Sequence, residues 1–274
     1  MHLADLRIGT SGWVYPFWAG GFYPSFTKPA DYLRTYSKIF KIVEIDSSFY
    51  RIPTRETIKE WTDGTADDFL FTAKISRRIT EEKRLADVKD DLQYTFKVFE
   101  SMRRKLAAFV FQLPPSFTFE EGIEKLAKMV PNLDPRYKYA VEFRHDSWFR
   151  EETYELLKAS KVSAAWSETP SATNPGPVTS EFVYLRFIGE RDIPESQLGE
   201  VRRDIASKKD LWAKRLKEQL RSAKSAYVFF NNRFEGFGPG SVNSFRKLLG
   251  MEEIDFRRIN LGGQQTLLDF GSGF

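Results

Sequence analysis

Short β-rich runs alternate with helical patterns along nearly the whole chain, and this alternation constrains the fold more than any other feature of the sequence. Strand and helix in alternation predict a parallel sheet whose strands are joined by crossover helices. Eight such units predict an α/β fold, a TIM-type (βα)8-like barrel with parallel strands inside and helices outside. The expected strands lie near residues 6–10, 41–46, 69–75, 107–113, 138–144, 162–166, 182–188 and 226–231.

The connection after the sixth expected strand differs from the others. Its sequence, "SETPSATNPGPVTSEF" (167–182), is rich in Pro, Ser and Thr and has no helical period, so we expect the sixth helix to be missing or replaced by a loop. We find no internal repeat, low-complexity tail or obvious linker. Because 274 residues suit one barrel, we expect a single TIM-barrel-like domain over residues 1–274.

The composition excludes several chemistries. The chain has no cysteine, so disulfides, a cysteine nucleophile, iron–sulfur clusters and thiolate zinc are excluded. His2 and His145 are the only histidines, and no zinc cluster is expected. A net charge of +4 favours anionic partners, either a small ligand or nucleic acid, although a solvated basic surface gives the same balance.

No apolar run approaches the ~20 residues that a membrane span needs, and the first residues lack a charged head followed by an apolar stretch. We therefore expect a cytoplasmic protein without a membrane partner. The sequence does not indicate the oligomeric state.

Polar and charged residues share one parity near the ends of several expected strands. Because side chains alternate across a strand, one parity of a barrel strand faces the helices and the other faces the axis. We expect the polar set to open into one pocket at the carboxyl ends of the strands, where βα-barrel active sites lie. The alternative is that these charges only neutralise one another in a polar interior. The set consists of Glu44, Asp46, Lys74, Gln112, Glu142, Arg144 and Arg186.

The residue types in this set indicate their roles. Glu44, Asp46 and Glu142 are candidate general acids or bases, or oxygen ligands for a hard cation such as Mg²⁺ or Mn²⁺. Arg144 and Arg186 are expected to hold an anion, because paired guanidinium groups suit phosphate or carboxylate oxygens.

Two further residues, Lys74 and His145, are candidate catalytic residues, and each also has a non-catalytic interpretation. A lysine made neutral by desolvation can form a Schiff base, but nearby carboxylates are expected to keep Lys74 protonated, which favours a fixed cation. His145 follows its strand, where parity no longer decides direction, and it serves either acid–base chemistry or loop anchoring.

Loops supply the remaining candidates for substrate binding. Trp13 follows a glycine-rich turn and either walls the pocket or caps the core. Tyr50 lies in "DSSFYR" after the second strand, and Gln112 ends the fourth. Asn231 and the glycine-rich segment around Gly238 follow the eighth strand, where many βα barrels bind phosphate through backbone N–H groups; a flexible turn is the alternative.

Six ordered blocks carry a family resemblance: "IGTSGWVYPFWAGGFYP" (8–24), "VEIDSSFYRIP" (43–53), "FLFTAKIS" (69–76), "FVFQLPPSF" (109–117), "AVEFRHDSW" (140–148) and "YVFFNN" (227–232). They resemble the signature blocks of the family called domain of unknown function 72, or YecE-like. The resemblance covers nearly the whole chain and implies a TIM-type barrel without a settled activity.

The chain departs from this family pattern at two places. The block near the seventh strand usually reads Arg-x-His-Gly, whereas "RFIG" here has Ile188 at the histidine position. After "FFNN" relatives tend to have a small run with Ala and Gln, and here the run is "RFEGFGPGSVNSF". If that histidine carries a proton or binds a ligand in relatives, this chain works without it.

Together these features predict a hydrolase or lyase that acts on an anionic, phosphate-bearing substrate, with nucleic acid as one candidate. The alternative from another class is a non-catalytic module that binds a ligand or nucleic acid.

Overall fold

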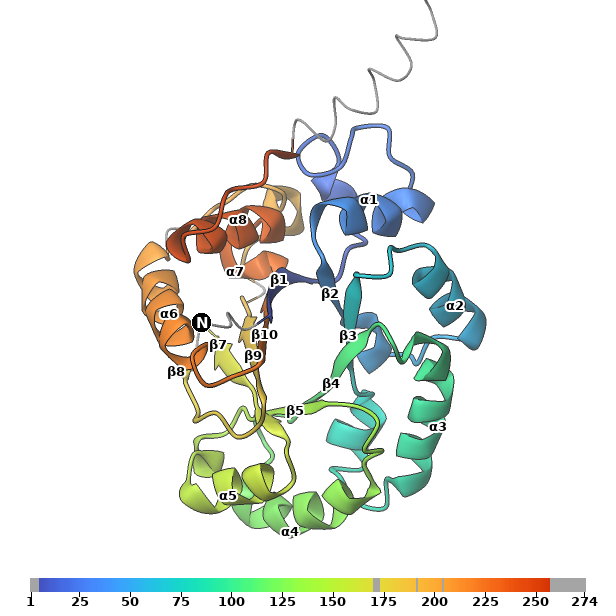
Figure 1. The fold of residues 1–274 in the computed structure, drawn as a ribbon, viewed down its shortest axis with the longest axis vertical. Helices are drawn as coiled ribbons and strands as arrows, with labels where there is room; N and C mark the ends of the chain where they lie inside the picture. Colours follow the sequence, from blue (N-terminus) through green and yellow to red (C-terminus); the bar gives the residue numbers. More distant parts are fainter. Residues whose placement is uncertain (1–4, 170–172, 191, 204, 257–274) are drawn as a thin grey trace, which may run out of the picture.

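The computed structural model of the chain describes residues 5–169, 173–190, 192–203 and 205–256, which leaves His2 outside the described part. Its described strands form one ten-stranded sheet, and helices surround the sheet as the alternation predicts (Figure 1). The order in the sheet is β6-β5-β4-β3-β2-β1-β10-β9-β7-β8. Every pairing is parallel except the one between β7 and β8. The bounds are β1 Asp5–Ser11, β2 Ile42–Ile45, β3 Leu70–Lys74, β4 Leu106–Gln112, β5 Tyr139–Glu142, β6 Ser163–Ala164, β7 Trp166–Glu168, β8 Thr173–Asn174, β9 Phe182–Phe187 and β10 Ser225–Phe230.

The sixth expected strand, 162–166, is divided into β6 and β7. The first half pairs with β5 and the second half with β9. One residue, Ala165, separates the two halves, and its N–H donates to the carbonyl of Val141 at 2.9 Å. The stretch from β6 to β7 therefore connects the β5 side of the sheet with its β9 side, and the sheet curls into the TIM-type barrel that the sequence predicts.

The helices lie outside the strands. Between β7 and β9 the described residues form β8 and loops without a helix, which agrees with the prediction for the sixth connection. The helical bounds are α1 Tyr32–Ile39, α2 Arg55–Asp63, α3 Lys89–Phe99, α4 Phe119–Met129, α5 Glu151–Ala159, α6 Ala206–Gln219, α7 Asn232–Glu235 and α8 Gly238–Leu248.

Local sequence explains where two of these helices begin. Thr54 precedes α2, and its side chain accepts a hydrogen bond from the N–H of Thr57. Thr118 precedes α4 and accepts from the N–H of Glu121 in the same way. Each cap satisfies one of the donors that a helix start leaves without a partner, and acidic residues in the first turn complement the helix dipole.

Apolar side chains fill two layers, one on each side of the strands. The larger layer lies between strands and helices and includes Phe71, Phe109 and Val141. The smaller layer fills the barrel axis and includes Ile42, Val110, Tyr184 and Phe229. Residues of opposite parity on one strand thus enter different layers, as the alternation rule requires. None of the described helices is both long enough and apolar enough to cross a membrane.

Candidate functional site

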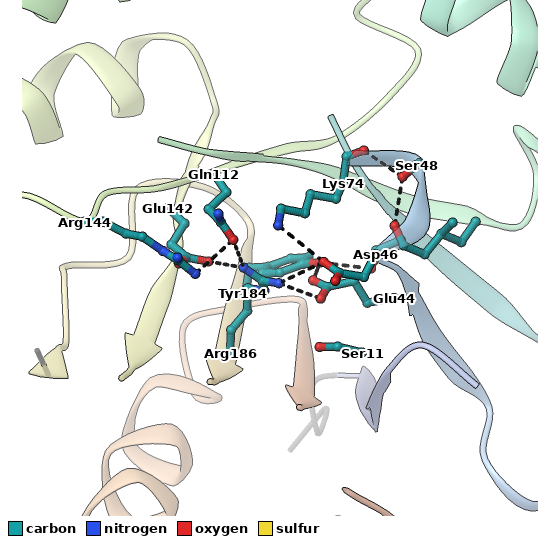
Figure 2. A network of polar contacts seen from close by, with 12 residues as sticks. Ser11, Glu44, Asp46, Ser48, Lys74, Gln112, Glu142, Arg144, Tyr184 and Arg186 are labelled. Carbon is teal, nitrogen blue, oxygen red and sulfur yellow. Dashed lines mark hydrogen bonds and ion pairs between the residues drawn. The ribbon is translucent and has the colours of Figure 1, made fainter. Parts of the chain in front are cut away.

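The polar residues of the axial parity lie above the apolar axial layer, at the carboxyl ends of their strands. Figure 2 shows that side chains from β2, β3, β4, β5 and β9 converge there. The parallel register explains part of this convergence, because Gln112 of β4 is the partner of Glu142 of β5. Chain segments more than 40 residues apart are thus brought to one end of the barrel, for example Arg186 and Glu142 with a separation of 44.

Arg186 is the hub of this network. Its Nη1 donates to Glu142 and to Gln112 Oε1, the latter at 3.1 Å, and its Nη2 donates to Glu44 Oε1 at 2.8 Å. Arg186 is only 2% exposed, and both glutamates are fully buried. The second oxygen of Glu44 accepts from the hydroxyl of Tyr184 at 2.7 Å. The two buried carboxylates are therefore held by a guanidinium and a phenol inside the barrel.

Arg186 forms a buried hub together with Glu44 and Glu142, and the charges of these three side chains stabilise one another. Burial by itself raises the pKa of Glu142, but the guanidinium groups of Arg186 and Arg144 outweigh it and lower the pKa to about 2. Burial lowers the pKa of Arg186, yet Glu142 and Glu44 outweigh it and hold that pKa well above its ordinary value. Glu142 remains ionised and Arg186 remains charged at neutral pH.

This geometry does not support the expectation that Arg186 is a clamp waiting for an anion. Both of its terminal nitrogens already contact buried carboxylates, and within the described residues only Nε has no hydrogen-bond partner. Arg144 is different because it is 25% exposed. Its Nε donates to Glu142 at 2.7 Å and its Nη2 to Gln112 at 2.9 Å. Arg144 is therefore the member of the pair that a ligand can reach.

Asp46 and Lys74 form a second, looser pair next to the hub. Lys74 Nζ lies 3.4 Å from Asp46 Oδ1 and 3.7 Å from the centre of the Phe49 ring. The same Asp46 oxygen lies 3.7 Å from Arg186 Nη2 and has no hydrogen-bond partner in the part of the chain that the structure describes. Burial lowers the pKa of Lys74, although Asp46 opposes this effect. This amine therefore loses its proton more readily than that of a surface lysine, and its role as a fixed cation stays a prediction.

A cavity of about 580 Å³ opens above these side chains. Glu44 and Glu142 lie beneath its floor, and Tyr50 stands at its edge with 62% of its surface exposed. Seven of the predicted site residues line this cavity: Asp46, Tyr50, Lys74, Gln112, Arg144, Arg186 and Asn231.

The structure places two predicted site residues elsewhere. Trp13 is buried against Trp61 and Phe71, with ring centroids 5.0 and 6.5 Å apart, so it caps the core between strands and helices and does not wall the cavity. His145 does not line the cavity either. Its Nδ1 accepts from the N–H of Ser147 at 3.2 Å, which anchors the loop after β5. The anchoring alternative therefore fits His145.

The expected phosphate cradle around Gly238 is also not formed. The Gly238 N–H donates to Asn232 Oδ1 at 3.0 Å, and the same oxygen accepts from Trp18 Nε1 at 3.0 Å. The next residue, Pro239, has no N–H. Asn231 caps the short helix α7 through its side-chain oxygen, which accepts from Arg233. The N–H groups of Gly238 and Arg233 are thus occupied by side chains of the protein.

Sequence reasoning missed several residues at the site. Ser11 ends β1 beside Glu44 in the register, and its buried hydroxyl has no hydrogen-bond partner among the described residues. The alternation rule, applied to β1, could have found Ser11, because Ser11 has the same parity as Arg7 and Gly9 and opposite parity to the apolar Ile8. Tyr15 lines the cavity from a loop and Asn232 from the first residue of the short helix α7, and no periodic pattern marks either of them.

A close backbone contact shapes the cavity wall. Ile188 lines the cavity, and the following Gly189 passes so close to the loop after β10 that a Cβ there would lie 1.8 Å from the carbonyl oxygen of Arg233. Only glycine permits this approach. Ile188, at the position where the family pattern described above has a histidine, gives the cavity an apolar side chain.

The carboxylates do not fit the Mg²⁺ or Mn²⁺ site that the sequence suggests. Glu44 and Glu142 contact opposite nitrogens of Arg186, so a guanidinium occupies the space between them. Within the described residues no group of three His, Cys, Asp or Glu side chains is arranged to hold a metal ion. Arg186 supplies the positive charge that these carboxylates require.

Fold and site together define a barrel protein with a polar, charged cavity at the carboxyl ends of its strands, the position of active sites in this architecture. The family model "Protein of unknown function DUF72" matches residues 7–262, and the chain belongs to that family.

Relatives and solved structures agree with this assignment. The UPF0759 protein YunF of Bacillus subtilis is 25% identical over 90% of this chain and 95% of its own length. UPF0759 protein YecE of Escherichia coli is 26% identical over 53% of this chain and 50% of its own length. A crystal structure of a DUF72 family protein from Thermotoga maritima is 29% identical, covers 90% of this chain and 99% of its own, and superimposes with a TM-score of 0.77. A second DUF72 family protein, from Enterococcus faecalis, has 20% identity and a TM-score of 0.72 over 92% of this chain and 100% of its own, which supports the fold.

Proposed function

We propose that this protein is an enzyme, a hydrolase or a lyase, that binds a small anionic substrate in the cavity above Arg186. The observation that carries the proposal is the pair of Asp46 and Lys74. Both line the cavity, and their charged atoms lie 3.4 Å apart; Asp46 Oδ1 lies farther, 3.7 Å, from Arg186 Nη2 and accepts no hydrogen bond from it. A carboxylate and an amine in contact supply a proton acceptor and a proton donor, which hydrolysis and elimination both need.

Arg144 is the proposed anion-binding group. Its guanidinium reaches the cavity while Glu142 and Gln112 fix its orientation, so less side-chain entropy is lost when a ligand binds. Phosphate is the proposed anionic group of the substrate, because guanidinium and phosphate match in charge and geometry. Arg233 adds a further positive charge to the same wall.

Nucleic acid is a second substrate class, supported by the exposed ring of Tyr50 at the cavity edge and by the net charge of +4. Aromatic rings at such positions stack on bases or sugars. The cytoplasmic location expected from the sequence is retained as part of this proposal.

A non-catalytic binding module is the alternative, and one observation favours it. Three cations (Lys74, Arg144 and Arg186) face three carboxylates (Glu44, Asp46 and Glu142), so the network is already neutral without a ligand. A protein that only binds would show affinity without turnover.

Calorimetry with inorganic phosphate and with phosphorylated metabolites tests the proposal. We expect binding to the native chain, and Arg144→Gln should weaken it by roughly tenfold or more, since a charged hydrogen bond contributes about 1.5–3 kcal/mol. Arg136→Gln is the matched control, because Arg136 pairs with Asp134 on the surface and does not line the cavity. Equal affinity in the native chain and in Arg144→Gln would reject the anion site.

Turnover separates the enzyme from the binding module. Ligands found by calorimetry are incubated with the native chain and with Asp46→Asn, and products are measured by mass spectrometry. We expect product only with the native chain. Binding of several ligands without any product would favour the non-catalytic alternative.

A further inference from the structure

Three lysines are buried in the described part of the chain, and Lys74 differs from the other two. Lys74, Lys105 and Lys209 are 6%, 8% and 5% exposed. Lys105 Nζ donates to the carbonyls of Thr62 and Thr65 at 2.7 and 2.8 Å.

Lys209 Nζ donates to Glu235 at 2.6 Å and to Ser244 at 2.7 Å. These hydrogen bonds fix both amines as structural cations. Lys74 Nζ makes no hydrogen bond to the described residues; it has one ion-pair contact, with Asp46 at 3.4 Å.

The surroundings of Lys74 suit a reactive amine. Its Nζ lies at the cavity, and the ring of Phe49 covers one side of it and keeps solvent away. Several charged groups act on it: burial and Arg186 lower its pKa, while Asp46, Glu142 and Glu44 raise it, and the net effect is a lower pKa. Glu44 and Glu142 are engaged by Arg186, which leaves Asp46 as the carboxylate in contact with the amine.

We propose that Lys74 Nζ is a nucleophile that forms a Schiff base with a small carbonyl compound bearing an anionic group. This inference rests on the proposed function, because it assigns the substrate class of the same cavity. The carbonyl carbon meets Lys74, and the anionic group meets Arg144 on the same cavity lining. A 2-oxo acid and a phosphorylated sugar both satisfy this requirement, and the shared chemistry is a carbonyl near an anion.

The step balances with the groups present. Asp46 accepts a proton from the Lys74 ammonium, and the free electron pair of Nζ attacks the carbonyl carbon. The C–N bond forms as the C=O π pair moves to oxygen, which takes up the proton held by Asp46. Asp46 then accepts a second proton from the nitrogen and passes it to the hydroxyl, which leaves as water as the nitrogen electron pair forms the C=N bond. Ammonium and carbonyl thus become a protonated imine and water, Asp46 is again a carboxylate, and no oxidant or reductant is needed.

Reductive trapping tests the inference. The full chain is incubated with glyoxylate or with glyceraldehyde 3-phosphate in the presence of cyanoborohydride, which reduces an imine to a stable secondary amine. Peptide mapping then identifies the modified lysines. Because a lowered pKa increases the fraction of neutral amine at a given pH, we expect Lys74 to be the lysine that is modified fastest at pH 7. Its rate should also persist to lower pH than theirs.

Four controls accompany the trapping. Lys105 and Lys209 in the same sample report on burial without reactivity, and both should stay unmodified. Lys74→Arg keeps the charge and the contact with Phe49 but cannot form an imine, so its labelling should fall to the background of the surface lysines. Propionaldehyde, a carbonyl without an anionic group, should label Lys74 more slowly than glyoxylate does. Asp46→Asn should slow trapping because it removes the proton acceptor.

The outcomes separate this inference from the proposed function. Adducts spread over surface lysines, with the same pattern in Lys74→Arg, would overturn the Schiff base. If phosphate still bound in calorimetry in that case, the anion site would stand and only the inference would fail. If neither phosphate binding nor trapping occurred, both would fail. Faster labelling by glyoxylate or by the phosphorylated sugar indicates which anion the cavity prefers.

Discussion

Replacing Arg186 tests whether the hub is structural. Arg186→Met removes the charge but keeps a long side chain, and it leaves Glu44 and Glu142 buried without their guanidinium partner. Breaking a buried ion pair by removing one partner costs about 3–5 kcal/mol, because the remaining charge is uncompensated. We expect Arg186→Met to lower the free energy of unfolding at pH 7 by that amount.

The pKa of Glu142 gives an independent magnitude. Its decrease from 4.5 to about 2 corresponds to about 3 kcal/mol at 1.4 kcal/mol per pKa unit. A carboxyl whose folded pKa is depressed contributes stability above its unfolded pKa and loses it as pH falls through the folded pKa. In the native chain this contribution is complete near pH 5 and above, and it declines between pH 4.5 and pH 2.

The stability of the variant should depend less on pH. Without Arg186, Arg144 alone opposes the effect of burial, so the pKa of Glu142 rises from its native value and the folded variant takes up a proton at a higher pH than the folded native chain does. Urea unfolding at pH 7, 5 and 4 therefore should show the stability gap between native chain and variant narrowing toward low pH. The double variant Arg186→Met with Glu142→Gln should lose less stability than the two single losses added together.

Arg136→Met provides the matched control. Its guanidinium pairs with Asp134 and Glu100 at the surface, where solvent screens the charges. We expect little change in the free energy of unfolding, and a stability gap between native chain and variant that does not narrow as pH falls. If Arg186→Met matched this control, with a small loss and a gap independent of pH, the reasoning about the buried hub would be refuted, and Arg186 would again be a candidate anion clamp.

Three further substitutions test the packing around the barrel, each by its change in unfolding free energy. Gly189→Ala should lose about 1–3 kcal/mol, because its Cβ meets the carbonyl oxygen of Arg233, whereas Gly21→Ala should change little, since its nearest neighbour lies at 3.9 Å. Tyr36→Phe should cost about 1–3 kcal/mol, because the hydroxyl accepts from the backbone of β1 at 2.9 Å and donates to that of residue 42 at 3.0 Å. Lys105→Met should cost a similar amount, about 1–3 kcal/mol, since it removes the amine that donates to the buried carbonyl of Thr65 and to the half-buried carbonyl of Thr62. Losses that do not exceed that of Gly21→Ala would contradict the assigned contacts.

The axial network was predictable because strand periodicity is local. Glu44, Lys74, Gln112, Glu142 and Arg186 all follow the alternation of their own strands, and the structure brings their side chains to one end of the barrel. Loop residues have no such period. Trp13 and His145 follow the ends of strands, where neighbouring contacts rather than alternation decide the direction of a side chain, and both lie away from the cavity.

The sequence alone determined the order of strands and helices, the missing sixth helix and the parity that turns charges toward the axis, because each depends on neighbours a few residues apart. Tertiary structure decided which charges are paired. Glu44 and Arg186 are 142 residues apart, and no local pattern indicates that both terminal nitrogens of the arginine, Nη1 and Nη2, contact buried carboxylates. The same closure of the barrel placed Lys74 Nζ 3.4 Å from Asp46 Oδ1, so the reactivity that we propose for that lysine depends on packing across the barrel and not on its place in the chain.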